Sequence, residues 1–185
     1  MPFAIFALLV SAAAAAGSLY MTLDMNLKAC TLCFYQRAFA FGLVGVLTTG
    51  LLAFRDRPAR VCMMAIPLAI GGLGVAGFHV YLGMTVWPRG NETWYLACPM
   101  GIEGYGTAPQ QSLAAFALVL LAALGGAVGE MRTTGEGGPA FLIALVLGVG
   151  AAAGSLVANP PMPKPAPADP NSPLDTCKPT LRDHG

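Results

Sequence analysis

Cys30 and Cys33 are separated by two residues, a spacing at which two sulfur atoms can form or exchange a disulfide. A long apolar segment follows them, so we expect the pair at the amino-terminal end of a helix, where the helix dipole favours thiolate. Cys33 lies three residues after Cys30, and Arg37 lies four residues after Cys33. This spacing places all three residues on one helical stripe. The guanidinium of Arg37 is expected near the sulfur of Cys33, at a membrane boundary where charge is usually functional. The pattern predicts thiol redox chemistry.

Two other interpretations of Cys30 and Cys33 stay open at this point. The pair can be an inert structural disulfide, or it can supply half of a metal site. The sequence has no second ligand pair at the spacing typical of zinc sites, which weakens the metal interpretation, and we predict no metal.

The chain has three further cysteines. Cys98 precedes a proline in a predicted loop and Cys177 lies in the tail, both on the same side of the membrane as Cys30. The two can form a second, exchangeable disulfide or a static clamp, or Cys177 can be an unpaired thiol, because spacing alone does not fix connectivity. Cys62 lies in an apolar segment, and we expect a small buried apolar residue without chemistry.

His79 follows Val61 by 18 residues, which corresponds to about 27 Å along a helix at 1.5 Å per residue. This depth is level with Arg37. A histidine there can hydrogen-bond a ligand carbonyl or move a proton, or it can simply bond to a neighbouring helix.

These residues require a scaffold, and the composition indicates a membrane protein. The 185 residues are 56% hydrophobic and 10% charged, with a mean hydropathy of +0.65, whereas soluble domains have about 25% charged residues. A bilayer core needs roughly 20 apolar helical residues, and backbone groups in lipid need internal partners. We therefore predict an all-α, polytopic membrane helical bundle. Its five segments are Pro2–Leu23, Cys33–Phe54, Val61–Trp87, Ser112–Val128 and Pro139–Ala158. The net charge of +1 does not suggest nucleic-acid binding.

Loop charge predicts the orientation. Three arginines lie within residues 53–60, which the positive-inside rule places in the cytoplasm. The loop 83–111 and the proline-rich tail 159–185 are then outside, and residues 1–158 form the bundle. The first segment could instead be a signal peptide, but no Lys or Arg precedes it and it is long enough to span. We expect it to be retained.

Two stretches resemble the DsbB/BdbC disulfide-formation family. They are Gly17-Ser18-Leu19-Tyr20 and Cys30-Thr31-Leu32-Cys33-Phe34-Tyr35-Gln36-Arg37, which has the form C-x-L-C-x-Y-Q-R. A fainter similarity continues through Gly77–Leu82. The resemblance implies a four-helix core that holds ubiquinone or menaquinone at its outer end, here with a fifth transmembrane helix. It also implies a partner of the DsbA type, with a thioredoxin fold, and the active cysteines on the periplasmic face of a bacterial inner membrane.

The resemblance further implies a role for each matched residue. Cys33 faces the quinone, and Cys30 exchanges with a second disulfide. Arg37 contacts the quinone, and His79 lies near the same pocket. Cys98 is the loop cysteine that meets the partner protein.

One departure concerns the second cysteine pair. Family members usually have both of its cysteines in the loop between the third and fourth helices, whereas this loop has only Cys98. The chain continues through a fifth segment into a tail with Cys177. We infer that Cys177 replaces the missing loop cysteine, which the family pattern does not itself contain.

Two other functions compete with thiol oxidation. A quinone-linked protein that delivers reductant to thiols, similar to vitamin K epoxide reductase, also uses cysteine pairs at helix ends, although the Tyr-Gln-Arg continuation argues against it. A membrane scaffold or assembly factor would use the outer cysteines only as structural disulfides. Thiol-dependent quinone reduction separates these functions. The predicted spans have too few polar groups to line a transport pathway.

Overall fold

The computed structural model of the protein describes residues 1–24, 30–86, 106–134 and 138–157. These residues form five helices: α1 (Pro2–Leu23), α2 (Thr31–Ala53), α3 (Pro58–Val86), α4 (Ala108–Thr134) and α5 (Gly138–Val157). The described residues contain no strand, and all five helices are long and apolar enough to cross a membrane. The predicted all-α, multi-pass membrane protein is therefore confirmed. The tail 159–185 with Cys177 and the part of the predicted outer loop that contains Cys98 lie outside the described residues.

The predicted segments agree with the helices to within a few residues. The first coincides with α1, whereas α2 begins two residues before its predicted start because Cys30 caps it. α4 extends beyond its predicted segment at both ends. The extension at the start of α4 includes Gln110 and Gln111, polar residues that hydropathy does not assign to an apolar span.

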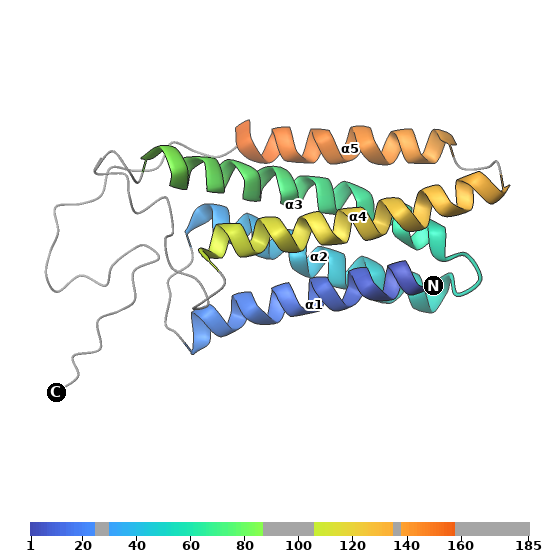
Figure 1. Cartoon of the computed structure of the whole chain (residues 1–185), viewed down its shortest axis with the longest axis horizontal. Helices are drawn as coiled ribbons and strands as arrows, with labels where there is room; N and C mark the ends of the chain where they lie inside the picture. Colours follow the sequence, from blue (N-terminus) through green and yellow to red (C-terminus); the bar gives the residue numbers. More distant parts are fainter. Residues whose placement is uncertain (25–29, 87–105, 135–137, 158–185) are drawn as a thin grey trace, which may run out of the picture.

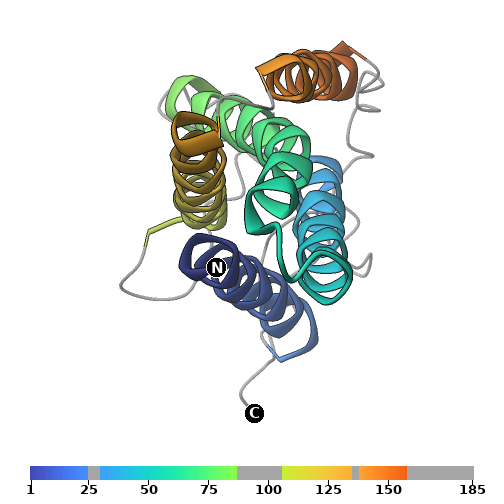
Figure 2. The same cartoon turned by 90° about the vertical axis from the view of Figure 1, so that its right-hand side faces the viewer.

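Helices α1 to α4 form a four-helix bundle, and α5 lies outside it against α3 (Figures 1 and 2). α3 contacts α2, α4 and α5, so it is the most enclosed helix of the five. Half of the most apolar stretch of α3 is buried, compared with 11% of that of α5. The remaining apolar surface of α5 is available to lipid.

Small residues allow the helices to approach closely, as in other membrane bundles. Gly71 of α3 lies against Phe39 of α2, where an added Cβ would be 2.6 Å from the ring. Gly148 of α5 lies in the same way against Ile70, with 2.9 Å to its side chain. A glycine of α3 thus receives a large side chain from α2, and a glycine of α5 receives one from α3.

The two ends of the bundle differ in chemistry. Successive helices alternate in direction, so the start of α2 and the ends of α1 and α3 lie at one end (Figure 1). The turn between α2 and α3 lies at the other end and has exposed arginines at Arg55, Arg57 and Arg60. The turn is closed by a bond from the backbone N–H of Arg57 to the carbonyl of Phe54, at 3.0 Å. The bundle thus separates its basic turn from its cysteine pair.

Candidate functional site

Cys30 is the N-cap residue of α2. Its backbone is extended, with φ −73° and ψ 168°, and its sulfur accepts a hydrogen bond from the backbone N–H of Cys33 at 3.2 Å. This is the position where Ser, Thr or Asp usually satisfies the first N–H groups of a helix. A sulfur held there faces the positive end of the helix dipole, which stabilises a thiolate.

Cys30 and Cys33 are present as a dithiol, with their sulfur atoms 2.8 Å apart. Cys30 precedes the membrane-spanning part of α2 and is buried, whereas Cys33 is partly exposed. The hydrogen bond from the Cys33 thiol lowers the pKa of Cys30 to about 5, with a further contribution from His79 that opposes the effect of burial. Cys30 is therefore the residue of the pair that is held as a thiolate at neutral pH.

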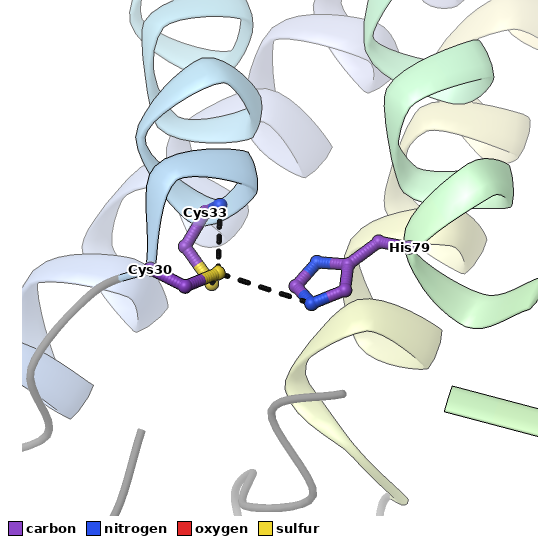
Figure 3. A group of neighbouring side chains, drawn as sticks. All are labelled: Cys30, Cys33 and His79. Carbon is purple, nitrogen blue, oxygen red and sulfur yellow. Dashed lines mark hydrogen bonds between the residues drawn. The ribbon is translucent and has the colours of Figure 1, made fainter. Parts of the chain in front are cut away.

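His79 reaches the dithiol from α3 (Figure 3). Its Nε2 lies 3.8 Å from the sulfur of Cys30, and its Nδ1 lies 3.0 Å from the amide nitrogen of Gln36. His79 is fully buried and Gln36 is 5% exposed, so each relies on protein partners for its polar atoms. Three polar side chains from two helices thus form a continuous chain of contacts inside the bundle.

Arg37 bonds mainly to α1. Its Nε donates to the hydroxyl of Ser18 at 2.8 Å, and its Nη2 donates to the Ser18 carbonyl at 3.0 Å and to the Thr22 hydroxyl at 2.5 Å. The guanidinium also lies 5.7 Å from the centre of the Phe34 ring. A charge at this depth needs such partners, and Ser18 from the family-like stretch supplies two of them.

A cavity of about 220 Å³ lies beside the dithiol, between α1, α2 and α4. Its α1 wall consists of Met21 and small residues that include Ala13, Ala14 and Gly17. Its polar lining is supplied by Ser18, Cys33, Gln36, Arg37, Gln111 and Ser112. Cys33 and Arg37 therefore share the wall of one cavity, whereas Cys30 and His79 are not among its lining residues.

The cavity suits one substituted aromatic or quinonoid ring. An apolar cavity of about 150 Å³ in another protein binds benzene, so this one has room for a ring with substituents. The N–H groups of Arg37 and the amide of Gln111 are the kinds of donor that a quinone carbonyl accepts.

The cluster of Cys30, Cys33 and His79 also has the composition of a metal site, since its three ligand atoms lie within 4.8 Å of one another. Three ligands are one fewer than a structural zinc site uses, and disulfide formation would consume two of them. We interpret the cluster as a redox dithiol with a neighbouring imidazole.

The structure brings together four of the six residues that the sequence singles out. Cys30, Cys33, Arg37 and His79 lie around one helix end, whereas Cys98 and Cys177 lie outside the described residues. Cys62 is buried in the apolar core, where a Cβ on Gly126 would lie 2.5 Å from its sulfur.

Sequence reasoning assigned no role to several polar residues of the site. Gln36 was part of the quoted motif but had no function, and Ser18, Thr22 and Gln111 had none either. The signal that could have found them is a polar side chain inside an apolar span, since such a group needs a partner in lipid.

Comparison with known proteins identifies the family of this chain. A sequence model described as "Disulfide bond formation protein DsbB" matches residues 2–112, which is more than half of the chain. The chain belongs to the DsbB family. The match ends in the first turns of α4, so α5 and the tail lie beyond it.

Two relatives of this DsbB-family chain are named "Probable disulfide formation protein". The one from Chlamydia trachomatis is 33% identical over 106 residues, covering 55% of this chain and 75% of the relative. The one from Chlamydia muridarum is 35% identical over 115 residues, covering 60% of this chain and 82% of the relative. No solved structure gives a significant match. The chain is thus a multi-pass membrane protein of the disulfide-forming DsbB family.

Proposed function

We propose that this protein is a membrane thiol:quinone oxidoreductase that re-oxidises a DsbA-like partner with a thioredoxin fold. The observation that carries the proposal is the position of the dithiol, which caps α2 while Cys33 also lines a cavity shared with Arg37. This arrangement supports separate roles for the two sulfurs, with Cys30 exchanging with protein thiols and Cys33 contacting a small oxidant.

The proposed reaction begins outside the bundle. A thiolate of the partner attacks the Cys98–Cys177 disulfide, and the second partner thiol completes the partner's own disulfide. One of the released thiolates then attacks Cys30 in the Cys30–Cys33 disulfide, and Cys33 leaves as a thiolate. The other outer thiolate resolves the mixed disulfide, which restores Cys98–Cys177 and leaves a reduced Cys30–Cys33 pair. Each attack needs a thiolate and releases another, and the N-cap position stabilises the Cys30 thiolate that leaves when the outer pair is restored.

The cavity side of the site supports the oxidation of that pair. A ubiquinone or menaquinone bound there would supply the acceptor for two electrons and two protons. Arg37, held by Ser18 and Thr22, places a positive charge on the cavity wall, which favours a thiolate at Cys33 and negative charge on a carbonyl oxygen. Gln36 of α2 and Gln111 of α4 add amide groups to the cavity lining.

The proposed setting is a bacterial inner membrane with the dithiol at the periplasmic face. The arginine-rich turn between α2 and α3 supports this orientation, since it lies at the end opposite the dithiol. An oxidising periplasm is also the compartment in which disulfides persist.

Quinone reduction by the purified protein tests the proposal. Reduced DsbA-type protein is the electron donor, ubiquinone and menaquinone analogues are the acceptors, and Cys33→Ser and Cys177→Ser are assayed beside the unmodified chain. We expect turnover that Cys33→Ser abolishes. Loss in Cys177→Ser as well would include the tail cysteine in the relay, whereas full activity would exclude it.

Two outcomes would contradict the proposal. No turnover with any quinone would favour a scaffold with structural disulfides. Reduction of the cysteines by quinol, without oxidation by quinone, would favour a protein that delivers reductant.

A further inference from the structure

The two sulfurs of the dithiol face different surroundings. Cys33 lines the cavity between α1, α2 and α4, together with Arg37. Cys30 instead packs on α3, where it forms a buried cluster with Leu32 and Val75 and contacts His79. The imidazole therefore lies beside the sulfur that exchanges with thiols in the proposed reaction.

Gln36 lies between these two environments. It is one turn beyond Cys33 on α2, it lines the cavity, and it contacts His79 at 3.0 Å. A glutamine that is 5% exposed needs a defined hydrogen-bond partner, because an unpaired buried amide is costly. The contact with His79 gives the buried amide of Gln36 such a partner.

This contact determines where the imidazole proton lies. The amide nitrogen of Gln36 can only donate hydrogen bonds, so Nδ1 of His79 must accept one. The proton of a neutral ring then lies on Nε2, which is the nitrogen 3.8 Å from the sulfur of Cys30. An N–H directed at a sulfur in this way stabilises a thiolate more than a thiol.

We propose that Gln36 is a positioning residue that holds His79 with its Nε2–H directed at Cys30, so that His79 stabilises the Cys30 thiolate. His79 then acts on the exchange side of the dithiol, and Arg37 acts on the cavity side. The benefit to turnover rests on the proposed function, since Cys30 is the thiolate released when the outer pair is restored. The arrangement of Gln36, His79 and Cys30 is independent of the proposed function.

Few other ionisable groups surround Cys30 in the described part of the chain. On α2 they are Cys33, Tyr35, which packs on the same cluster, and Arg37 one turn beyond Cys33. At the end of α1 they are Tyr20 and Asp24, one turn apart, and the first turns of α4 contain no ionisable residue. A change at Gln36 is therefore expected to reach Cys30 through His79.

The pH dependence of Cys30 alkylation tests the proposal. The full-length protein with Cys62→Ala, Cys98→Ser and Cys177→Ser is reduced and treated with iodoacetamide from pH 4 to 10, and modification of Cys30 is followed by mass spectrometry. We expect Gln36→Met, which keeps the length of the side chain but removes its amide, to raise the midpoint by about one pH unit, which is about a tenfold loss of thiolate at pH values well below both midpoints.

Gln36→Glu is the matched rescue variant. A carboxylate would accept from Nδ1 of an imidazolium, and a protonated carboxyl would donate to Nδ1, so either form keeps a proton on Nε2. The midpoint should therefore stay near that of the unmodified site. Equal shifts in Gln36→Met and Gln36→Glu would overturn the proposal, as would no shift in Gln36→Met.

A double-mutant cycle separates positioning from a direct effect on Cys30. In a His79→Asn background, Gln36→Met should add no further shift, and an additive shift would overturn the proposal.

Nitrogen NMR of the histidine ring gives a measurement that needs no substitution at Cys30, Gln36 or His79. The chain has two histidines, so His184→Gln leaves His79 as the only signal. We expect the shifts of a neutral ring protonated on Nε2, and a ring protonated on Nδ1 would contradict the proposal. Neither measurement needs quinone or a partner protein, so failure here differs from failure of the proposed function.

Discussion

Cys30 and Cys62 are both buried, at 6% and 1% exposure, but their surroundings have little in common. Cys30 caps a helix and contacts a backbone N–H, a second thiol and an imidazole. Cys62 belongs to the main apolar core between the helices, close to Gly126. Burial by itself therefore does not distinguish a reactive cysteine from a packing residue in this protein.

The difference lies in the polar groups that accompany each sulfur. An apolar environment disfavours a thiolate, whereas a helix N-terminus and hydrogen-bond donors stabilise one. Gln36, His79 and Arg37 also lie at the Cys30 end of the bundle, within apolar spans. A polar or charged side chain in such a span costs free energy unless it has polar partners. Such a concentration of buried polar groups indicates a functional end of the bundle.

The largest expected difference between the two cysteine environments is in turnover. Cys33→Ser should lower quinone reduction by at least about a thousandfold, the scale on which loss of a nucleophile acts in other enzymes. Cys62→Ala should leave the rate within about twofold, because it removes only a small core side chain. Rates are measured with reduced DsbA-type protein as donor, and a large loss in Cys62→Ala would invalidate the comparison.

The second expected difference is in the pH dependence of the thiols. Since the pKa of Cys30 is lowered from 9.0 to about 5, its thiolate should persist down to about pH 5 and be lost as the pH falls through that value. The midpoint for alkylation of Cys30 should thus lie about four pH units below that of an ordinary thiol. Cys62 should react only after unfolding. A Cys30 midpoint near pH 9 would show that the N-cap and His79 do not stabilise the thiolate.

The sequence predicts the features of the site that depend on one segment of the chain, but not the contacts that depend on how two helices pack. The five spans follow from length and hydropathy, and the helical stripe of Cys30, Cys33 and Arg37 follows from spacing along one helix. The contact between His79 and Cys30 depends on how α3 is rotated against α2. An amphipathic pattern usually indicates that rotation, but a membrane helix is apolar on both its lipid-facing and its core-facing sides.

The same limit applies to the partners of Arg37. Its charge at the membrane boundary was predicted to serve the sulfur of Cys33, yet its hydrogen bonds run to Ser18 and Thr22 on α1. Hydrogen bonds between helices that are distant in sequence require the tertiary packing. Gln36 was not assigned for the same reason, because its partner lies 43 residues away.

A third prediction concerns Arg37 at the cavity wall. Arg37→Met keeps an apolar side chain of similar reach but removes the charge, and a hydrogen bond to a charged group is worth roughly 1.5 kcal/mol or more. The apparent Michaelis constant for quinone should therefore rise about tenfold, while disulfide exchange with the partner continues. Arg55→Met, in the exposed turn at the opposite end, is the matched control and should leave both the Michaelis constant for quinone and the rate of disulfide exchange unchanged. An unchanged Michaelis constant in Arg37→Met would remove Arg37 from the quinone site.

The smallest expected effect on chemistry is at the Cys62 side of the comparison. Gly126→Ala would place a Cβ 2.5 Å from the sulfur of Cys62, so the α3–α4 contact must shift, and overpacking of this kind typically costs about 1–3 kcal/mol. Gly45→Ala on α2 is the matched control, because its Cβ would meet no atom within 4 Å. We expect a lower thermal unfolding midpoint in detergent for Gly126→Ala only, and an unchanged alkylation midpoint for Cys30 in both variants. A shifted Cys30 midpoint in Gly126→Ala would mean that packing at Cys62 is coupled to the dithiol, and the two cysteine environments would then have to be treated as one.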